Sequence, residues 1–442
     1  MILLVLPLVA WAGPNAATVS GEHAAPAPAA VQVQVAPVPE GEPRQVVATP
    51  GMSLQAIVSS LPRGSQLRLS AGLHKGPLFL DRPMELSGEA GAVLSGEGAG
   101  SVLVIGAPDV VVHDLHITGG GHRSDLDDSG VVVGADRGRL ERLLVDQVYL
   151  GLDLRMASHG IVRDCIFKGD PAKLFGARGD AIRLWESREN LIEGNLITDS
   201  RDVVVWYSAD NVIRGNTVRG SRYGTHLMHS DNNLVEDNRY ENDVVGVFVM
   251  YSTGLTLSRN LVMGALGPAG VGFGFKESDE LRVEGNSLIS NTTGLFLDTT
   301  PHNINGEATF RDNVIAANGV GIRFHGPQYG GDFTHNSFEA NRSVVAVDGG
   351  VDSGQYRIQG NHWSDYEGYD LDGDGLGDLP YEARSLSASL LDRQSLLSFF
   401  EGSPAMTLLD LFAEAFPMFR PPAILTDPTP LVRWDLTAEG SP

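Results

Sequence analysis

The sequence predicts an all-β protein: a right-handed parallel β-helix with a capping helix at its N-terminal end and a short helical extension at its C-terminal end. The first observation is a short motif that recurs about every 22 residues, in which an asparagine lies three positions after one apolar residue and two before another. These asparagines are Asn195, Asn216, Asn238, Asn260, Asn286, Asn313, Asn336 and Asn361. The second observation is that the surrounding segments are rich in Val, Ile, Thr and Phe and lack helical spacing, so each repeat is one coil of strands and turns.

The residues that flank each asparagine are apolar or aromatic in every repeat. Three positions before the asparagine stand Ile192, Ile213, Val235, Leu257, Val283, Phe310, Phe333 and Ile358. Two positions after it stand Ile197, Val218, Tyr240, Val262, Leu288, Ile315, Phe338 and Trp363. Stacked coils would bury these side chains and leave each asparagine at a tight bend, where it tolerates left-handed geometry and bonds the backbone or the next asparagine. We interpret the asparagine column as structural.

Length and charge narrow the function classes. The chain has 442 residues, which is ample for a large buried core. Its formal net charge is -23, from 32 Lys and Arg against 55 Asp and Glu. This balance argues against binding to nucleic acid, whose phosphates require a basic face. The only cysteine, Cys165, cannot form a disulfide within the chain and is expected inside a coil.

Five segments are expected along the chain. They are a signal peptide at 1–12, an Ala/Pro-rich linker at 13–50, the β-helix at 51–363, an acidic Asp/Gly loop at 364–382 and a helical, Pro-rich extension at 383–442. The first segment is an apolar run that ends in small residues at Ala10 and Ala12, which indicates export.

Short helices are expected at both ends of the solenoid. Ser53–Leu61 is amphipathic and should cover the first coil, because the ends of a solenoid need capping. In the C-terminal extension, helices are expected at Ser387–Phe400 and Ala405–Phe416. The second has Ser403 as its N-cap and Pro404 at the first helical position.

A second alignment appears in the coils from Gly179 to Glu277, where five segments end in serine. The residue three positions before each serine is apolar and should face inward, so its two neighbours should face outward. The following neighbours form one outward column: Trp185, Trp206, Met228, Met250 and Lys276. The preceding neighbours form the other: Arg183, Val204, His226, Phe248 and Gly274. Exposed apolar patches mark binding surfaces, so Trp185, Trp206 and Phe248 are candidate partner contacts.

Three residues of these columns form a candidate copper site. His226 and Met228 share one face of a strand, and Met250 lies one coil later beside Met228. Thioether and imidazole groups so placed suit Cu(I), a soft ion. Trp206 could add a cation–π contact, and His229 could reach the site from the turn. The alternative is a hydrophobic docking patch for a partner protein, without metal.

The acidic loop is a candidate calcium site. Asp370, Asp372 and Asp374 alternate with other residues, Gly375 follows, and Asp378 adds a fourth carboxylate. This pattern matches the first part of a calcium loop, although the acidic residue expected at its twelfth position is replaced by tyrosine. The alternative is an acidic turn that ends the solenoid and binds nothing.

An enzymatic function is the competing hypothesis. Pectate-lyase-like solenoids often host polysaccharide lyases and hydrolases, which need clustered carboxylates and a basic group in a groove. Here the regular outward columns are apolar and the acids are scattered, so fold analogy alone does not indicate catalysis. An adhesin or structural spike is a third class, which would predict a homotrimer.

Two stretches resemble the NosD family. They are RYGTHLMHSDNNLVEDNRYENDVVGVFVMYS, from Arg222 to Ser252, and GNHWSDYEGYDLDGDGLGDLPY, from Gly360 to Tyr381. The second is the more specific, and the resemblance extends from about Gly51 to Leu431.

The resemblance implies a non-enzymatic protein of the Gram-negative periplasm. Such a protein would work with the ATPase and membrane subunits of an ABC-type complex. It would receive copper from a donor protein and deliver it to nitrous oxide reductase during maturation. The resemblance also implies that the helices after Ser385, with Leu409 and Phe412, contact the membrane subunit.

Overall fold

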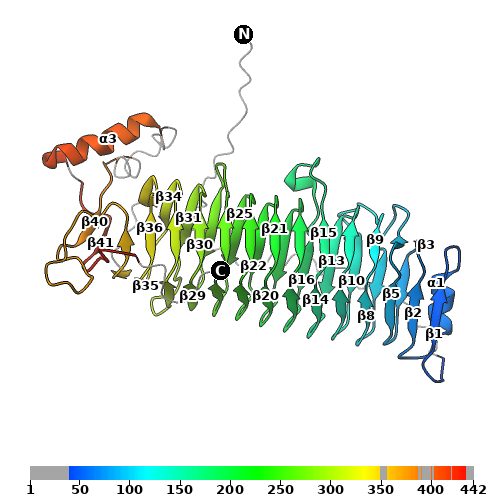
Figure 1. Cartoon of the computed structure of the whole chain (residues 1–442). Coiled ribbons are helices and arrows are strands. Elements are labelled where there is room, and N and C mark those ends of the chain that lie inside the picture. The colour runs from blue at the N-terminus through cyan, green and yellow to red at the C-terminus, as the bar shows by residue number, and fades with distance from the viewer. Residues whose placement is uncertain are drawn as a thin grey trace, which may run out of the picture. The chain divides into compact units, whose positions relative to one another are not determined.

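The computed structural model describes residues 39–348, 356–386, 390, 400, 403–419 and 421–434. All of them belong to one compact unit, Val38–Pro442. Strands of successive coils stack into three long parallel sheets, with the coils following one another in sequence order (Figure 1). The predicted parallel β-helix is therefore confirmed. The expected signal peptide and residues 13–38 of the expected linker lie outside the described residues.

The first sheet has 14 strands and begins inside the expected linker. Its strands in spatial order are β1 (Gln45–Ala48), β2 (Gln66–Leu69), β5 (Glu85–Gly88), β8 (Val111–His113), β11 (Arg139–Glu141), β14 (Ile161–Arg163), β17 (Leu191–Glu193), β20 (Val212–Arg214), β23 (Leu234–Glu236), β26 (Thr256–Ser258), β29 (Leu281–Glu284), β32 (Ala308–Arg311), β35 (Asp332–Thr334) and β38 (Arg357–Gln359). β1 pairs in register with β2, so the solenoid starts before residue 51.

The second sheet has 13 strands, and each lies one bend after a strand of the first sheet. They are β3 (Gly72–Lys75), β6 (Ala92–Ser95), β9 (His116–Thr118), β12 (Leu144–Asp146), β15 (Ile166–Lys168), β18 (Leu196–Thr198), β21 (Thr217–Arg219), β24 (Arg239–Glu241), β27 (Leu261–Met263), β30 (Ser287–Ile289), β33 (Val314–Ala316), β36 (Ser337–Glu339) and β39 (His362–Trp363).

The third sheet has 12 strands and carries the candidate copper site. They are β4 (Leu78–Leu80), β7 (Leu103–Ile105), β10 (Ser129–Val133), β13 (Leu150–Arg155), β16 (Ile182–Trp185), β19 (Asp202–Trp206), β22 (Tyr223–Met228), β25 (Val245–Met250), β28 (Val271–Lys276), β31 (Thr293–Asp298), β34 (Val320–His325) and β37 (Ser343–Asp348). A short 3₁₀ helix, η1 (Phe175–Ala177), lies in the excursion before β16.

The repeat asparagines form a continuous buried ladder between the first and second sheets. The Nδ2 of Asn195 donates to Oδ1 of Asn216 at 2.9 Å, and the same bond recurs at each step as far as Asn361. The expected left-handed geometry falls one residue earlier, for example on Gly194 and Asp237, and not on the asparagines. The asparagine side chain can therefore run along the axis while the preceding residue makes the bend.

The residues that flank the ladder form the core, as the repeat predicted. All sixteen are buried, and Phe310 stacks on Phe333 while Phe338 stacks on Trp363, each pair at 4.4 Å. Cys165 is also buried inside a coil, and burial raises the pKa of its thiol to about 12. The thiol is therefore protonated and unreactive.

Helix α1 (Leu54–Ser60) covers the N-terminal end, as expected. Ser53 caps it by accepting a hydrogen bond from the backbone N–H of Ala56. Gln55 exchanges two hydrogen bonds with the backbone of Phe79 in β4. This contact seats the helix on the first coils.

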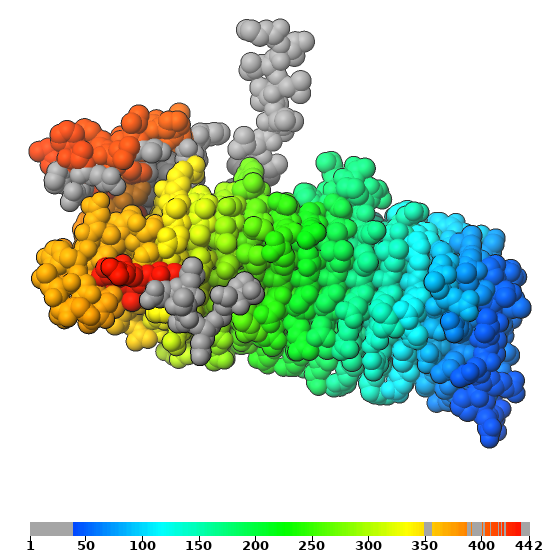
Figure 2. Space-filling model, viewed as in Figure 1, coloured from blue at the N-terminus to red at the C-terminus, as the bar shows by residue number. Residues whose placement is uncertain are grey.

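The C-terminal end is closed by residues 425–434, which we call the strap. It begins with β41 (Leu425–Asp427), antiparallel to β40 (Tyr381–Ala383). The strap lies against the acidic loop (Figure 2), where Gly377 N–H donates to Pro430 O at 2.7 Å. Leu431 bridges to His362 in β39, so the strap extends the second sheet by one rung and covers an edge that would otherwise be open.

Asp427 of the strap terminates the asparagine ladder. Its fully buried carboxylate accepts hydrogen bonds from Nδ2 and the backbone N–H of Asn361. The same carboxylate also accepts hydrogen bonds from Gly360 N–H, Trp363 Nε1–H and Thr429 N–H. A single carboxylate thus satisfies the donors that the last coil leaves without a next asparagine.

Helix α3 (Pro404–Ala415) confirms the second of the two expected C-terminal helices. Ser403 caps it, Pro404 opens it, and the 3₁₀ helix η4 (Pro417–Phe419) follows. The helix expected at Ser387–Phe400 lies outside the described residues, apart from residues 390 and 400. Among the described residues, no helix combines the length and hydropathy needed to cross a membrane.

Candidate functional site

The outer face of the third sheet carries both predicted columns in register. Trp185 pairs with Trp206, Trp206 with Met228, and Met228 with Met250 on successive strands β16 to β25. His226 pairs with Phe248 in the neighbouring column. The repeat period alone therefore gave the correct neighbours, because parallel coils stack with matching positions over one another.

His226 and Met250 lie in direct contact. The Nε2 atom of His226 is 3.4 Å from the Sδ atom of Met250, on the next strand. Metal–nitrogen and metal–sulfur bonds of about 2.0 and 2.3 Å, at about the tetrahedral angle, place the two donor atoms ~3.5 Å apart. The observed separation therefore matches two ligands of one metal ion without rearrangement of the backbone.

His226 is more buried than the sequence indicated. It was expected on the outer face beside Met228, but it is only 8% exposed. Met228 and Met250 were expected to be surface-exposed, and they are half-buried. Tyr223 stacks on its ring with centroids 4.8 Å apart, and Trp206 meets it edge-on at 5.9 Å. Long aromatic side chains on both sides thus cover a position that strand alternation had correctly placed on the outer face.

Burial sets the charge state of this imidazole. It lowers the pKa of His226 to about 4, so the ring is neutral at ordinary pH and one of its two nitrogens has a free lone pair that can bind a metal. The Nδ1 atom of His226 and the Nε1 atom of Trp206 are buried without hydrogen-bond partners. A thioether is only a weak acceptor, so the polar groups here lack strong protein partners. This donor set fits a soft monovalent ion.

His229 takes a different position from the one expected. Its ring does not join the His226 column but stacks between Tyr207 and Tyr251, with centroids 5.1 Å from each. These three residues share a turn column just after β19, β22 and β25, each with a positive φ near 50°. The result is an exposed ring stack beside the Trp/Met column.

Three of the predicted partner contacts are aromatic residues of the third sheet, and each contacts another aromatic ring. Trp185 and Trp206 meet edge-to-face at 6.1 Å, and Phe248 meets Tyr223 at 6.0 Å. In α3, Phe412 is 43% exposed, whereas Leu409 is half-buried. Other large apolar side chains of this segment are exposed as well: Leu408, Leu411, Phe416, Met418 and Phe419. The described part of the chain thus offers two apolar surfaces, one on the third sheet and one on α3 and η4.

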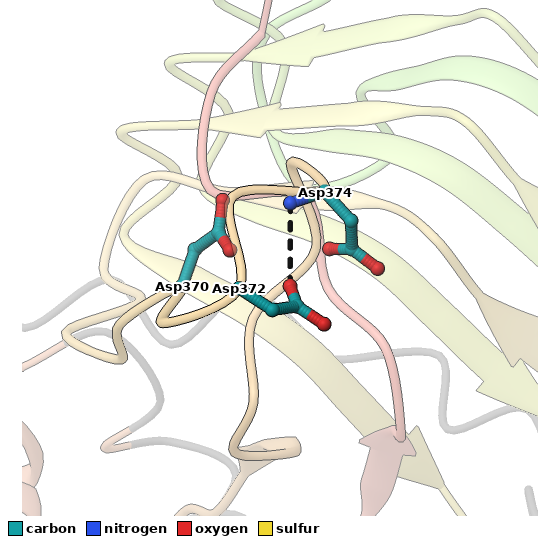
Figure 3. Close-up of side chains that lie close together, drawn as sticks. All are labelled: Asp370, Asp372 and Asp374. Carbon is teal, nitrogen blue, oxygen red and sulfur yellow. Dashed lines mark hydrogen bonds between the residues drawn. The ribbon is translucent and has the colours of Figure 1, made fainter.

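The acidic loop gathers three of its four predicted carboxylates. Asp370, Asp372 and Asp374 have oxygens within 4.8 Å of one another, on one exposed turn (Figure 3). Asp378 instead accepts a hydrogen bond from Leu371 N–H at 2.7 Å. Backbone N–H groups, first that of Gly375, hold the pKa of Asp370 below its usual value. The loop geometry is therefore also stabilised by its own hydrogen bonds.

A charged cluster on the same outer face was not predicted from the sequence. Asp153 is fully buried and accepts hydrogen bonds from Arg183 at 2.8 and 2.9 Å and from Arg155. Asp127 pairs with Arg183 as well. Extending the outward columns back to β13 would have placed Asp153 beside Arg183, because the two pair in register. Two carboxylates and two guanidinium groups balance, which makes the cluster a structural network.

A family model described as "Periplasmic copper-binding protein (NosD)" matches residues 146–368. A protein of Pseudomonas aeruginosa named "Probable ABC transporter binding protein NosD" is 29% identical over 414 residues, covering 83% of this chain and 87% of its own. A protein of Stutzerimonas stutzeri with the same name is 29% identical over 397 residues, covering 83% and 86%.

Among solved structures, the catalytic unit of a GH87 α-1,3-glucanase from Streptomyces thermodiastaticus superposes with a TM-score of 0.51. It is 13% identical, and the match covers 75% of this chain and 70% of that one. This likeness is one of fold alone. The family model, in contrast, spans about half of the 442 residues and includes the whole asparagine ladder together with His226, Met228 and Met250. The chain belongs to the NosD family.

Proposed function

We propose that this protein is a periplasmic accessory protein that binds copper and delivers it to nitrous oxide reductase during maturation, without catalysing a reaction itself. It would receive the ion from a copper donor protein and act together with the ATPase and membrane subunits of an ABC-type complex. The family description and the names of the two relatives support copper binding and an ABC transporter partner.

The observation that carries the proposal is the contact between His226 and Met250. A neutral imidazole nitrogen and a thioether sulfur stand 3.4 Å apart on adjacent strands, with Met228 paired beside Met250. These donors suit Cu(I) and disfavour hard divalent ions, which prefer carboxylate and carbonyl oxygens. Trp206 borders the same position and can contribute a cation–π contact.

The two apolar surfaces are proposed as partner contacts. Trp206 and Phe248 border the copper site and Trp185 contacts Trp206, so these three residues would meet the protein that gives or takes the ion. Leu409 and Phe412 would contact the membrane subunit through α3. Large exposed apolar groups are a cost in water unless a partner covers them.

The decisive experiment is Cu(I) competition binding with a double Met228→Leu, Met250→Leu variant. Leucine keeps the size and hydrophobicity but has no donor atom, so copper affinity should fall at least about tenfold while docking of the reductase in a pull-down survives. Met263→Leu, a half-buried methionine in the second sheet, is the matched control. Unchanged copper affinity of the double variant would leave a partner surface and no metal site.

Cellular and enzymatic tests separate the remaining alternatives. Deleting the gene should yield an exported reductase that lacks copper, and normal copper loading would contradict the delivery role. The purified protein should not cleave uronate or neutral polysaccharides, with or without Ca²⁺. Turnover that an acid-to-amide change abolishes would instead establish a polysaccharide-degrading enzyme.

A further inference from the structure

The proposed copper position is enclosed on most sides. His226 is 8% exposed, and Tyr223, Trp206 and Phe248 lie around it. An ion that enters or leaves must therefore cross the exposed edge of this patch. Exchange between two proteins is fastest when a ligand outside the site can hold the ion while an inner bond breaks.

His229 stands at that edge with its nitrogens available. The residue is exposed, and neither ring nitrogen has a hydrogen-bond or ion-pair partner among the described residues. Tyr207 and Tyr251 stack on its two faces with interplanar angles of 10° and 17°. A metal binds imidazole in the plane of the ring, so stacking fixes the orientation of the ring and leaves both donor positions open.

The coil register connects His229 to the enclosed site. One coil earlier, the equivalent residues Trp185 and Tyr207 meet edge-to-face at 5.3 Å. Trp185 is paired with Trp206, and the rings of Tyr207 and His229 are stacked, so Trp206 and His229 hold the corresponding positions one coil later. Trp206 in turn contacts His226. His229 also follows directly on Met228, which is paired with Met250, and Met250 contacts His226, so the exposed imidazole is next in sequence to a proposed ligand of the site.

We propose that His229 is the exchange ligand of the copper site: it receives Cu(I) from the donor, passes it to His226 and Met250, and later hands it on. The step is ligand substitution. Copper stays in the +1 state, one metal–nitrogen or metal–sulfur bond forms as another breaks, and no electron is transferred. Tyr207 and Tyr251 are positioning residues that hold the ring plane. This inference rests on the proposed function, because it requires a copper site beside His229.

The test measures affinity and exchange rate separately with one probe. Copper affinity is obtained from equilibrium competition with bicinchoninate, and the transfer rate from stopped-flow absorbance after the Cu(I)-loaded protein meets excess bicinchoninate. His229→Phe keeps the ring stack and removes both nitrogens, and His229→Gln is a second variant. Both should retain the parent affinity and transfer copper about tenfold more slowly, which is the lower end of the loss of activity that follows removal of an outer residue of a metal site.

A matched control is His159→Gln, an exposed histidine in a turn of an earlier coil, which should change neither quantity. If both His229 variants transfer copper at the parent rate, the exchange role is wrong. If they lose affinity as severely as the Met228→Leu, Met250→Leu variant, His229 is a permanent ligand and the proposal is also wrong. If the parent protein binds no Cu(I), the proposed function itself fails, and the exchange role with it.

Discussion

Replacing Asp243 with asparagine should stabilise the protein, and more strongly at pH 8.5 than at pH 5. Asp243 is 2% exposed and lies in a polar column between the second and third sheets. Its Oδ1 accepts a hydrogen bond from Ser221 N–H, but its Oδ2 is buried without a partner. Three later coils have Asn291, Asn318 and Asn341 in this column.

Those asparagines show what the missing partner is. Their Nδ2 groups donate to the backbone carbonyls of Val262, Leu288 and Ile315. By the same spacing, the Oδ2 of Asp243 should face a backbone carbonyl oxygen, with which an ionised carboxylate cannot form a hydrogen bond. An asparagine at this position would donate to that carbonyl and leave the bond from Ser221 intact.

The pKa gives the magnitude and the sign. Burial raises the pKa of Asp243 from 3.8 to about 8. Because the folded-state pKa lies above the unfolded-state pKa, the parent protein loses unfolding free energy as pH rises. The loss is absent below about pH 4 and reaches a plateau above about pH 8. At 1.36 kcal/mol per pKa unit, the raised pKa destabilises the parent protein by at most about 4 kcal/mol at pH 7. Local relaxation should reduce the realised gain to about 1–3 kcal/mol, the usual cost of an unpaired buried group.

The assay is urea unfolding of parent and Asp243→Asn at about pH 5, 7 and 8.5, with the difference in unfolding free energy as the readout. That difference should grow with pH. Asn291→Asp places an unpaired carboxylate oxygen at a position where both polar atoms of the asparagine side chain are hydrogen-bonded. This variant should be less stable than the parent, and the difference should grow with pH. If the Asp243→Asn difference is independent of pH, or if the variant is less stable, the carboxyl group of Asp243 is not an unpaired buried group.

Four further outcomes are expected. Asp427→Ala should release the strap and expose it to limited proteolysis, because five donors lose their acceptor; a parent-like digestion pattern would contradict the cap. If the acidic loop binds Ca²⁺, added Ca²⁺ should raise the midpoint of thermal unfolding. At 100 times its dissociation constant, the ion adds about 2.7 kcal/mol to the free energy of unfolding. The rise should vanish in Asp372→Ala, and equal midpoints with and without Ca²⁺ would make the loop a simple turn. Copper affinity should be constant between about pH 5 and 8, because the folded pKa of His226 is about 4; a decline that begins near pH 6.5 would mean that the imidazole is not buried when copper binds. Phe412→Ser should weaken binding of the membrane subunit without lowering stability, since this side chain is 43% exposed, and unimpaired binding would remove α3 from the interface.

The sequence by itself determined the coil period, the ladder and the register of the outward columns. In a parallel solenoid, residues one period apart are neighbours in space, so the spacing of Asn195 and Asn216 also places Met228 beside Met250. Local signals sufficed for α3 as well, because Ser403 and Pro404 mark a helix start within one turn.

Only the tertiary structure decided which outward residues are exposed and how the solenoid ends. Periodicity places His226 on the outer face, but its burial depends on the rotamers of Tyr223 and Trp206, which no repeat encodes. Asp427 reaches Asn361 across an excursion of more than sixty residues that follows no period. The repeat spacing predicts contacts between residues at matching positions of different coils. Contacts made by large side chains and by non-repeating segments form only when the whole chain has packed.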